Sequence, residues 1–141
     1  MVFGKFNLNI MITEDYVSYE IAKLLKEKGS EGQCIAYYSK YVDNNSKLHR
    51  WRNRQTYVNV RNDGYTLVPT MQMAMKWLRE VHNIAIQVFP VITEDTWCFD
   101  VYKKDDEGIW KSEPENLSDI DFGLCEECLN AALVYTLENL V

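Results

Sequence analysis

The sequence predicts an α+β fold in two layers, with one antiparallel sheet of about five to six strands and three helices packed on it. Three observations predict this fold: two segments with helical periodicity that end at Gly29 and Asn83, an Asp-Gly pair between two alternating runs, and alternating apolar side chains over 96–102. The expected element order is α-β-β-β-α-β-β-β-α. A length of 141 residues fits one domain. We therefore expect residues 12–141 to form a single α+β domain, and residues 1–11 to be an N-terminal extension or an edge strand.

The first helix is predicted over residues 18–28. The side chains that recur at helical spacing share one face: Val17, Ile21, Leu24, Leu25 and Lys28. Ser18 is a suitable N-cap, because its hydroxyl can accept a hydrogen bond from a backbone N–H of the first turn. Gly29 stands where a glycine commonly ends a helix.

A second helix is predicted over 70–82 and a third over 122–140. Pro69 favours an extended conformation at the residue before it, and Thr70 is a natural N-cap for the second helix. The expected buried stripe of the second helix consists of Ala74, Trp77, Leu78 and Val81. The expected core face of the third helix consists of Leu129, Leu133, Thr136, Leu137 and Leu140.

Strands are expected where side chains alternate in character and turn residues separate the runs. The predicted ranges are 33–41, 56–61, 65–68, 84–89, 96–102 and 109–112. The second and third ranges flank Asn62-Asp63-Gly64, a sequence that is typical of a hairpin turn. In the fifth range, Trp97, Phe99 and Val101 are expected to share one face of the sheet.

Charge is distributed unevenly along this chain, whose net charge is −6. Residues 40–61 contain six basic residues and one acidic residue, whereas residues 93–141 contain thirteen acidic residues and three lysines. Such an asymmetry is typical either of a polar partner surface or of two solvated faces.

The chain has no run of about 18 apolar residues. Residues 1–10 also lack the basic and apolar regions of a signal peptide. We therefore expect no membrane partner and a cytoplasmic location. In that compartment the four cysteines stay reduced: Cys34, Cys98, Cys125 and Cys128. Two disulfides would be the alternative in a secreted chain.

One short motif has potential chemistry, Cys125-Glu126-Glu127-Cys128. A Cys-x-x-Cys pair can supply half of a zinc site or a redox pair. The sequence contains no second ligand pair of this kind, and the two glutamates are expected to raise the pKa of the thiols. We therefore expect both cysteines to pack as small apolar residues, and we expect no metal site.

Catalytic residues are not recognisable in this sequence. The two histidines, His49 and His82, have no Ser, Cys or Asp at a known catalytic spacing. No glycine-rich phosphate-binding loop occurs among the six glycines. The residue inventory therefore predicts a non-enzymatic protein without a cofactor.

The basic segment 47–54 is the sharpest binding candidate. Its candidate partner-binding residues are Arg50, Trp51, Arg52 and Arg54. Arginines bind phosphate and Trp51 can stack on a base, so a nucleic-acid-binding accessory protein is one hypothesis. The order from Thr70 onward, a helix, three strands and a helix, is also that of double-stranded RNA-binding domains, although residues 119–127 are acidic where those domains are basic.

Methionines crowd the second predicted helix at positions 71, 73 and 75. Methionine side chains adapt to varied partner surfaces, so Met71 and Met75 are further candidates for partner binding. The alternative is core packing with one or two methionines exposed, because the three side chains point in different directions around the helix.

Two stretches carry a resemblance to a known family: ITEDYVSYEIAKLLKEKG at 12–29 and PTMQMAMKWLREVHNI at 69–84. They resemble the opening and the central helix of a family of small proteins encoded by phages and mobile elements of gut anaerobic bacteria. In these relatives the start methionine usually stands at the position of Met11, which puts residues 1–10 in doubt as a structural element. The resemblance implies no activity and assigns no functional residue.

These observations favour a non-enzymatic protein-interaction or regulatory module of a phage or mobile element. A protein partner is therefore expected, although the sequence does not identify it. The alternative is a nucleic-acid-binding accessory protein that uses the Arg/Trp-rich segment 47–54.

Overall fold

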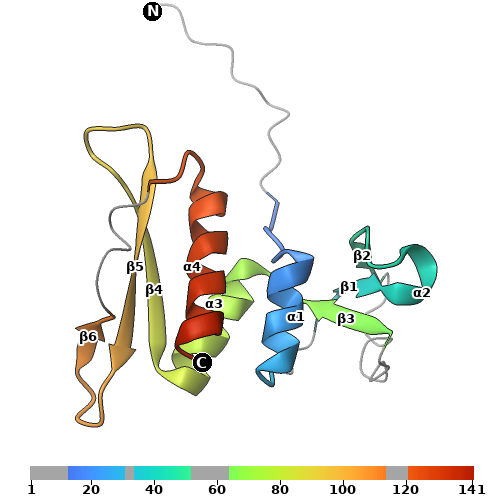
Figure 1. Ribbon diagram of the computed structural model, residues 1–141, viewed down its shortest axis with the longest axis horizontal. Helices are drawn as coiled ribbons and strands as arrows, with labels where there is room; N and C mark the ends of the chain where they lie inside the picture. The colour runs from blue at the N-terminus through green and yellow to red at the C-terminus, as the bar shows by residue number, and fades with distance from the viewer. Residues whose placement is uncertain (1–12, 31–33, 52–63, 114–120) are drawn as a thin grey trace, which may run out of the picture.

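The computed structural model describes residues 13–30, 34–51, 64–113 and 121–141 (Figure 1). Its elements, in chain order, are α1 (Tyr19–Glu27), β1 (Ala36–Ser39), α2 (Lys40–Asp43), β2 (His49–Arg50), β3 (Tyr65–Val68), α3 (Met71–His82), β4 (Ile84–Pro90), β5 (Trp97–Lys104), β6 (Trp110–Ser112) and α4 (Cys125–Asn139). The predicted extension 1–11 and the predicted strand 56–61 lie outside the described residues.

The elements form three layers, with helices between two small antiparallel sheets (Figure 1). One sheet has the strand order β2-β1-β3 and the other β4-β5-β6. α1 packs on β3, α4 packs on β4 and β5, and the two helices contact each other. The α+β class is therefore confirmed. The prediction of one five- to six-stranded sheet covered by three helices is wrong, since the described residues form two three-stranded sheets and include a fourth helix, the four-residue α2.

The difference arises because the alternation of side chains along a strand is limited as a predictor. Alternation shows that one face of the strand is buried, but it does not show which strand is the neighbour. Here each strand pairs only with strands of its own half of the chain. α4 contacts α1 as well as β4 and β5, so one helix covers both a sheet and another helix.

The register of the first sheet divides its residues between two faces. Ala36 lies opposite Arg50 and Val68, and Tyr37 lies opposite His49. Ala36 and Val68 are fully buried members of the core. Because successive side chains of a strand point to opposite faces, Tyr37 and His49 lie on the face that is turned away from α1.

The second sheet is an antiparallel meander. β4 pairs with β5 over its whole length, with Ile86 opposite Val101 and Val88 opposite Phe99, and β6 pairs with the end of β5. Phe99 and Val101 are buried and Trp97 is half-buried against the core, as expected for side chains that share one face. This face is the one that α4 covers.

The predicted ends of the first two long helices are confirmed. The hydroxyls of Ser18 and Thr70 each accept a hydrogen bond from a backbone N–H of the first turn, at 3.3 and 3.2 Å. Gly29 and Asn83 follow the two helices with positive φ angles of 85° and 56°. Glycine and asparagine tolerate this left-handed conformation better than other residues do, which explains why the helices stop there.

Two details of the helices differ from the prediction. α4 begins at Cys125 and not near residue 122, because Phe122 forms an antiparallel bridge with Trp97. The buried residues of α3 are Met71, Ala74 and Leu78. Val81, which lies in the last turn of α3, is 57% exposed. Helical spacing alone therefore overestimates the length of the buried stripe.

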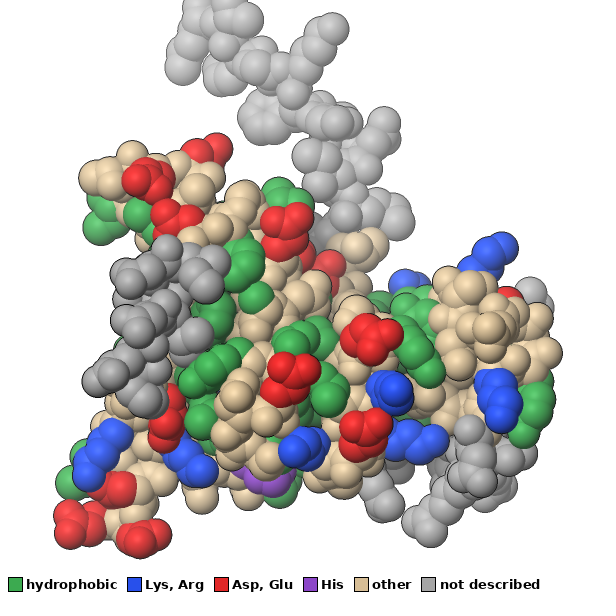
Figure 2. Space-filling model, in the orientation of Figure 1, with side chains coloured by type: hydrophobic (Ala, Val, Ile, Leu, Met, Phe, Trp, Pro, Cys, Tyr) green, Lys and Arg blue, Asp and Glu red, His purple; other side chains and the backbone are tan. Residues whose placement is uncertain are grey.

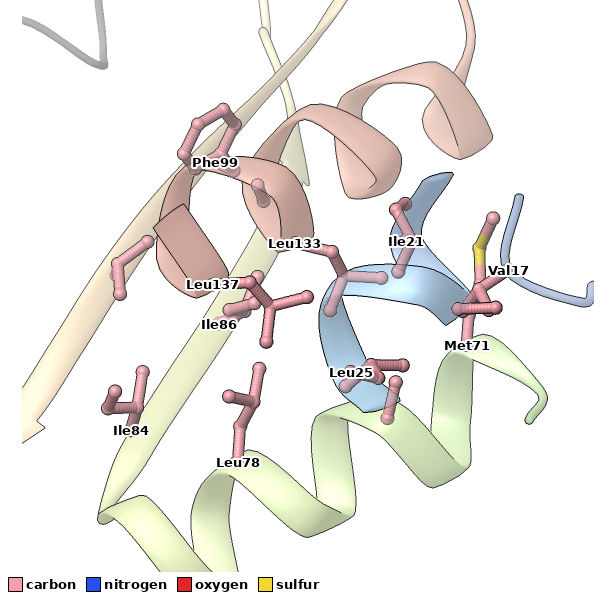
Figure 3. Close-up of a cluster of buried hydrophobic side chains, with 14 of the residues drawn as sticks. Val17, Ile21, Leu25, Met71, Leu78, Ile84, Ile86, Phe99, Leu133 and Leu137 are labelled. Atoms are coloured by element: carbon pink, nitrogen blue, oxygen red, sulfur yellow. The ribbon is translucent and has the colours of Figure 1, made fainter. Parts of the chain in front are cut away.

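The hydrophobic core lies where the helices meet the sheets (Figure 3). Side chains of α1, α3 and α4 converge there with side chains of β4 and β5. The labelled members of the core are Val17, Ile21, Leu25, Met71, Leu78, Ile84, Ile86, Phe99, Leu133 and Leu137. Removing this apolar surface from water is the main force that stabilises the fold. The sheet faces that are turned away from the helices lie outside this core.

Candidate interaction surface

The face of the first sheet that is turned away from α1 is rich in aromatic side chains. We call it the outer aromatic face, and it consists of Ile35, Tyr37, His49, Trp51 and Tyr65. The register explains why these residues meet. Tyr37 lies opposite His49, and the backbone N–H of Trp51 donates to the carbonyl of Ile35 at 2.8 Å. Tyr65, on the neighbouring strand β3, belongs to the same face.

Tyr37 stands at the centre of this face and contacts three rings. Its ring stacks on Trp51 with centroids 4.1 Å apart and on His49 with centroids 5.4 Å apart. The Tyr65 ring lies 5.7 Å away in a tilted arrangement. Aromatic pairs at such separations attract each other by about 0.5–1.5 kcal/mol beyond the burial of their area. The cluster is therefore ordered without a partner.

α2 adds the exposed Tyr41 beside the outer aromatic face, and the next residue of the helix, Val42, is exposed as well. Tyr41 is 63% and Val42 is 67% exposed, and the Tyr41 ring lies 6.1 Å from that of Tyr65. Ser39 anchors α2, because its buried hydroxyl accepts hydrogen bonds from the backbone N–H groups of Tyr41 and Val42 at 3.2 and 3.3 Å. The Tyr41 ring also rests on Gly64, at which a Cβ atom would overlap it.

Ser39→Ala is expected to lower the free energy of unfolding by about 1 kcal/mol, the typical cost of a lost N-cap. The substitution removes the acceptor of two N–H groups at the start of α2. Urea unfolding followed by circular dichroism measures the effect. Ser112→Ala, at an exposed serine of β6, is the control and is expected to leave the midpoint unchanged. Equal midpoints for both variants would show that the Ser39 hydroxyl does not anchor α2.

Charge separates along the molecule (Figure 2). Acidic side chains gather near the β4–β5 loop and the start of α4 and again, next to lysines, at the β5–β6 turn, whereas mostly basic side chains surround the first sheet. In α2, beside the first sheet, the ammonium of Lys40 lies 6.0 Å from the centre of the Tyr41 ring. The carboxylate of Asp43 is engaged by the His49 ring at 2.9 Å. The surroundings of the outer aromatic face therefore favour a partner with acidic groups at its rim.

The basic segment 47–54 divides between two faces. Arg50 lies on the opposite face from Trp51, where its guanidinium is 4.9 Å from the centre of the Tyr16 ring. Trp51 is half-buried on the outer aromatic face. Arg52 and Arg54 lie outside the described residues. Alternation along β2 and the residue after it thus separates two side chains that the sequence pattern places in one patch.

The methionine candidates of α3 lie in or against the core. Met71 is 6% exposed, and Met75 is half-buried and packs on the core. Met73 is the more exposed methionine, at 39%. Successive positions of a helix are rotated by about 100°, so residues two apart point in clearly different directions. α3 therefore presents one methionine to solvent and no continuous strip.

The cysteines are free thiols, and three of them are buried: Cys34, Cys98 and Cys128. Burial raises the pKa of Cys34 and of Cys128 to about 11. The Cys98 thiol donates to the Asp121 carboxylate at 2.9 Å, and this bond raises the pKa of Cys98 to about 11. Burial and neighbouring carboxylates raise the pKa of the half-buried Cys125. Raised pKa values disfavour the thiolate, the form in which cysteine acts as a nucleophile.

A pocket of about 270 Å³ lies where the N-terminal ends of α3 and α4 approach each other. Its polar lining includes the carboxylates of Glu14, Asp15 and Glu126 and the thiol of Cys125. Carboxylates are stabilised near helix N-termini by the partial positive charge there, which accounts for them without a ligand. No imidazole lines the described part of this pocket to serve as a base near neutral pH.

The residues of α2 and β1 are the ones that the sequence pattern failed to single out. Tyr37, Tyr41 and Val42 lie outside the basic segment and carry no charge, so the pattern of basic residues does not indicate them. The signal is present in the run from Ile35 to Val42, in which Ile35 and Tyr37 stand two residues apart and Tyr41 and Val42 follow in a short helix. Alternate positions of a strand share one face, so Ile35 and Tyr37 lie on the same side of the sheet.

Within the described part of the chain, no group of three or more His, Cys, Asp or Glu side chains is placed to hold a metal ion. None of the described helices has both the length and the apolar character that crossing a membrane requires. Comparisons with models of protein families, with curated proteins and with solved structures find no match. The outer aromatic face and α2 are thus the strongest functional feature of the described residues.

Proposed function

We propose that this protein is a non-enzymatic protein-interaction or regulatory module of a phage or mobile element, that it acts in the cytoplasm, and that the outer aromatic face with α2 is its docking surface. The observation that carries the proposal is the exposure of Tyr41 and Val42 beside an ordered aromatic cluster. Contiguous exposed apolar side chains on a protein surface commonly mark an interaction site.

The composition of this surface is typical of protein interfaces. Tyrosine and tryptophan are the residues that most often dominate binding energy, and they do so when a partner excludes water from them. Tyr37, Trp51 and Tyr65 already hold one another in place, so docking costs little additional side-chain entropy. Lys40 and Lys47 belong to the segments beside the face and supply a basic rim.

A nucleic-acid partner is the second candidate, and one observation favours it. Stacked rings next to lysines are also the elements with which proteins bind single strands. The position of Arg50 argues for the protein partner, because its guanidinium lies over Tyr16 on the opposite face and cannot contact a strand laid on these rings.

The test compares two double variants of the full chain. Tyr41→Asp with Val42→Asp places charge on the docking surface, and Val81→Asp with Ile92→Asp places the same charge at exposed apolar residues elsewhere, which are 57% and 99% exposed. Each is immobilised and exposed to host lysate, and retained proteins are quantified by mass spectrometry. We expect at least one protein that the wild type and the second variant retain and that the first variant loses at least about tenfold.

Two results contradict the proposal. One is the retention of the same proteins, in the same amounts, by both double variants. The other is the binding of a labelled 20-nucleotide single strand of DNA or RNA at low salt, lost in the Tyr41/Val42 variant, in the absence of any protein that behaves in this way. That second result establishes the nucleic-acid alternative instead.

A further inference from the structure

β4 is an edge strand of unusual composition. It forms one side of the second sheet, and no other described strand pairs with its outer edge. All seven of its residues pair with β5. Its sequence, IAIQVFP, contains no charged residue, and its single polar side chain is the exposed Gln87.

Proteins normally protect an edge of this length. Lysine, glutamate, an early proline or a bulge prevents another strand from adding to it. β4 has none of these before Pro90, which ends the strand, and within the described ranges no backbone hydrogen bond reaches its outer edge, although α3 and α4 both contact the strand. A long, uncharged and regular edge is therefore a surface that accepts a further strand.

The register shows which backbone groups of β4 are available. Just outside the strand, the carbonyl of Asn83 accepts from Lys104 and the N–H of Val91 donates to Thr96, so residues 83 and 91 face β5. In an antiparallel pair the N–H and C=O groups of one residue point to the same side, and successive residues alternate. The N–H and C=O groups of Ile84, Ile86 and Val88 therefore point to the outer edge.

We propose that two copies of this chain associate through β4, in antiparallel register about a two-fold axis at Gln87, to form one continuous six-stranded sheet. An edge that pairs with its own copy about a two-fold axis makes a closed, self-complementary interface. The axis at Gln87 lies at the midpoint of Ile84–Pro90, so every residue of the strand lies opposite a residue of the second copy, although Pro90 has no N–H to donate to Ile84.

The side chains of β4 are complementary to themselves in this register. Ile86 lies opposite Val88 of the second copy, and both are β-branched residues of the core-facing side whose backbone groups point to the outer edge. Ala85 lies opposite Phe89 of the second copy, so a small side chain meets a large one. Gln87 meets Gln87 of the second copy at a position where the two Cα atoms are only about 4.5 Å apart and the side-chain amides can hydrogen-bond.

This complementarity is the reason to choose a second copy over an unrelated strand. Each non-identical pair occurs twice, once on each side of the axis, so every favourable contact is doubled. The interface lies on the second sheet and uses none of the residues of the outer aromatic face. Self-association through β4 is therefore independent of the partner proposed for the first sheet.

Charged substitutions of Gln87 test whether the two-fold axis of the dimer lies at this residue. Gln87→Lys and Gln87→Glu each place two like charges opposite one another, and we expect each variant to dissociate at about fivefold higher protein concentration than the wild-type dimer. An equimolar mixture of the two variants pairs opposite charges and is expected to recover the dimer. Sedimentation equilibrium measures all four samples, and circular dichroism confirms that each variant is folded.

A cysteine at position 87 supplies a second, covalent measurement. Two Cα atoms about 4.5 Å apart suit a disulfide, so Gln87→Cys is expected to cross-link into dimers under mild oxidation. Ser112→Cys, on the opposite edge strand β6 and also exposed, is the control and is expected to remain uncross-linked. Wild-type protein, oxidised under the same conditions, measures any cross-linking through the native cysteines.

A wild-type chain that is monomeric at all concentrations and a Gln87→Cys variant that does not cross-link together overturn the proposal. A dimer that neither charge variant weakens also overturns it, because its interface then lies elsewhere. Cross-linking of Ser112→Cys in place of Gln87→Cys would assign the interface to β6.

Discussion

Leu133→Ala is expected to lower the free energy of unfolding by about 3 kcal/mol, within the ~2–5 kcal/mol that such truncations cost in cores. Leu133 lies in the middle of α4 and is fully buried. It belongs to the cluster shared by α1, α3 and α4 and points towards Ile21 (Figure 3). The truncation leaves a cavity between tightly packed helices, which cannot collapse freely to fill it. Urea unfolding followed by tryptophan fluorescence measures the loss.

The matched control is Leu124→Ala, the same chemical change at the residue before α4. Leu124 is 56% exposed and makes no side-chain cap to the helix. Its truncation is expected to change the free energy of unfolding by less than about 0.5 kcal/mol. Similar losses for the two variants would show that α4 is not packed between the second sheet and α1.

Cys128→Ser has the second largest expected effect, a loss of about 2 kcal/mol in the free energy of unfolding. Cys128 is fully buried in the core. Cysteine packs there as a small apolar residue, whereas serine places a hydroxyl in the hydrophobic core, so the substitution buries a polar group in place of an apolar one. Chemical unfolding in the presence of a reducing agent measures the effect without interference from disulfides.

Cys125→Ser separates packing from chemistry in the Cys-x-x-Cys motif. Cys125 is only half-buried, so serine at this position is expected to change stability by less than about 0.5 kcal/mol. A redox pair or a metal site would need both sulfurs and would respond to either substitution. If Cys125→Ser is as costly as Cys128→Ser, packing of Cys128 alone does not explain the motif.

Local features of the fold could be predicted because they depend on neighbours in sequence. Ser18, Thr70, Gly29 and Asn83 determine helix ends through their own hydrogen bonds and φ angles, and these ends are where they were predicted. The shared face of β5 follows from the pleat in the same way. The division into two sheets could not be predicted, since it depends on which strands meet in space.

The candidate surface was predicted only in part, and the reason is geometric. Arg50 and Trp51 are adjacent in sequence and carry suitable chemistry, but β2 turns them to opposite faces. Met71 is suited to an adaptable interface, yet its position in the first turn of α3 places it in the core. Tyr37 and Tyr41 lack charge, so the pattern of basic residues does not indicate them. Side-chain type predicts what a residue can bind, whereas the fold decides whether it is accessible.

The three-layer arrangement has a consequence for the cooperativity of the protein. In the part of the chain that the structure describes, the two sheets share no ladder of hydrogen bonds, so the first sheet can open locally while the second sheet and α4 stay folded. β2 contains only two residues and β1 and β3 four each, which makes this half the less protected one. A partner that docks there would selectively stabilise the weaker half. When the partner is bound to the first sheet, amide hydrogen exchange in β1 and β3 would then be slower.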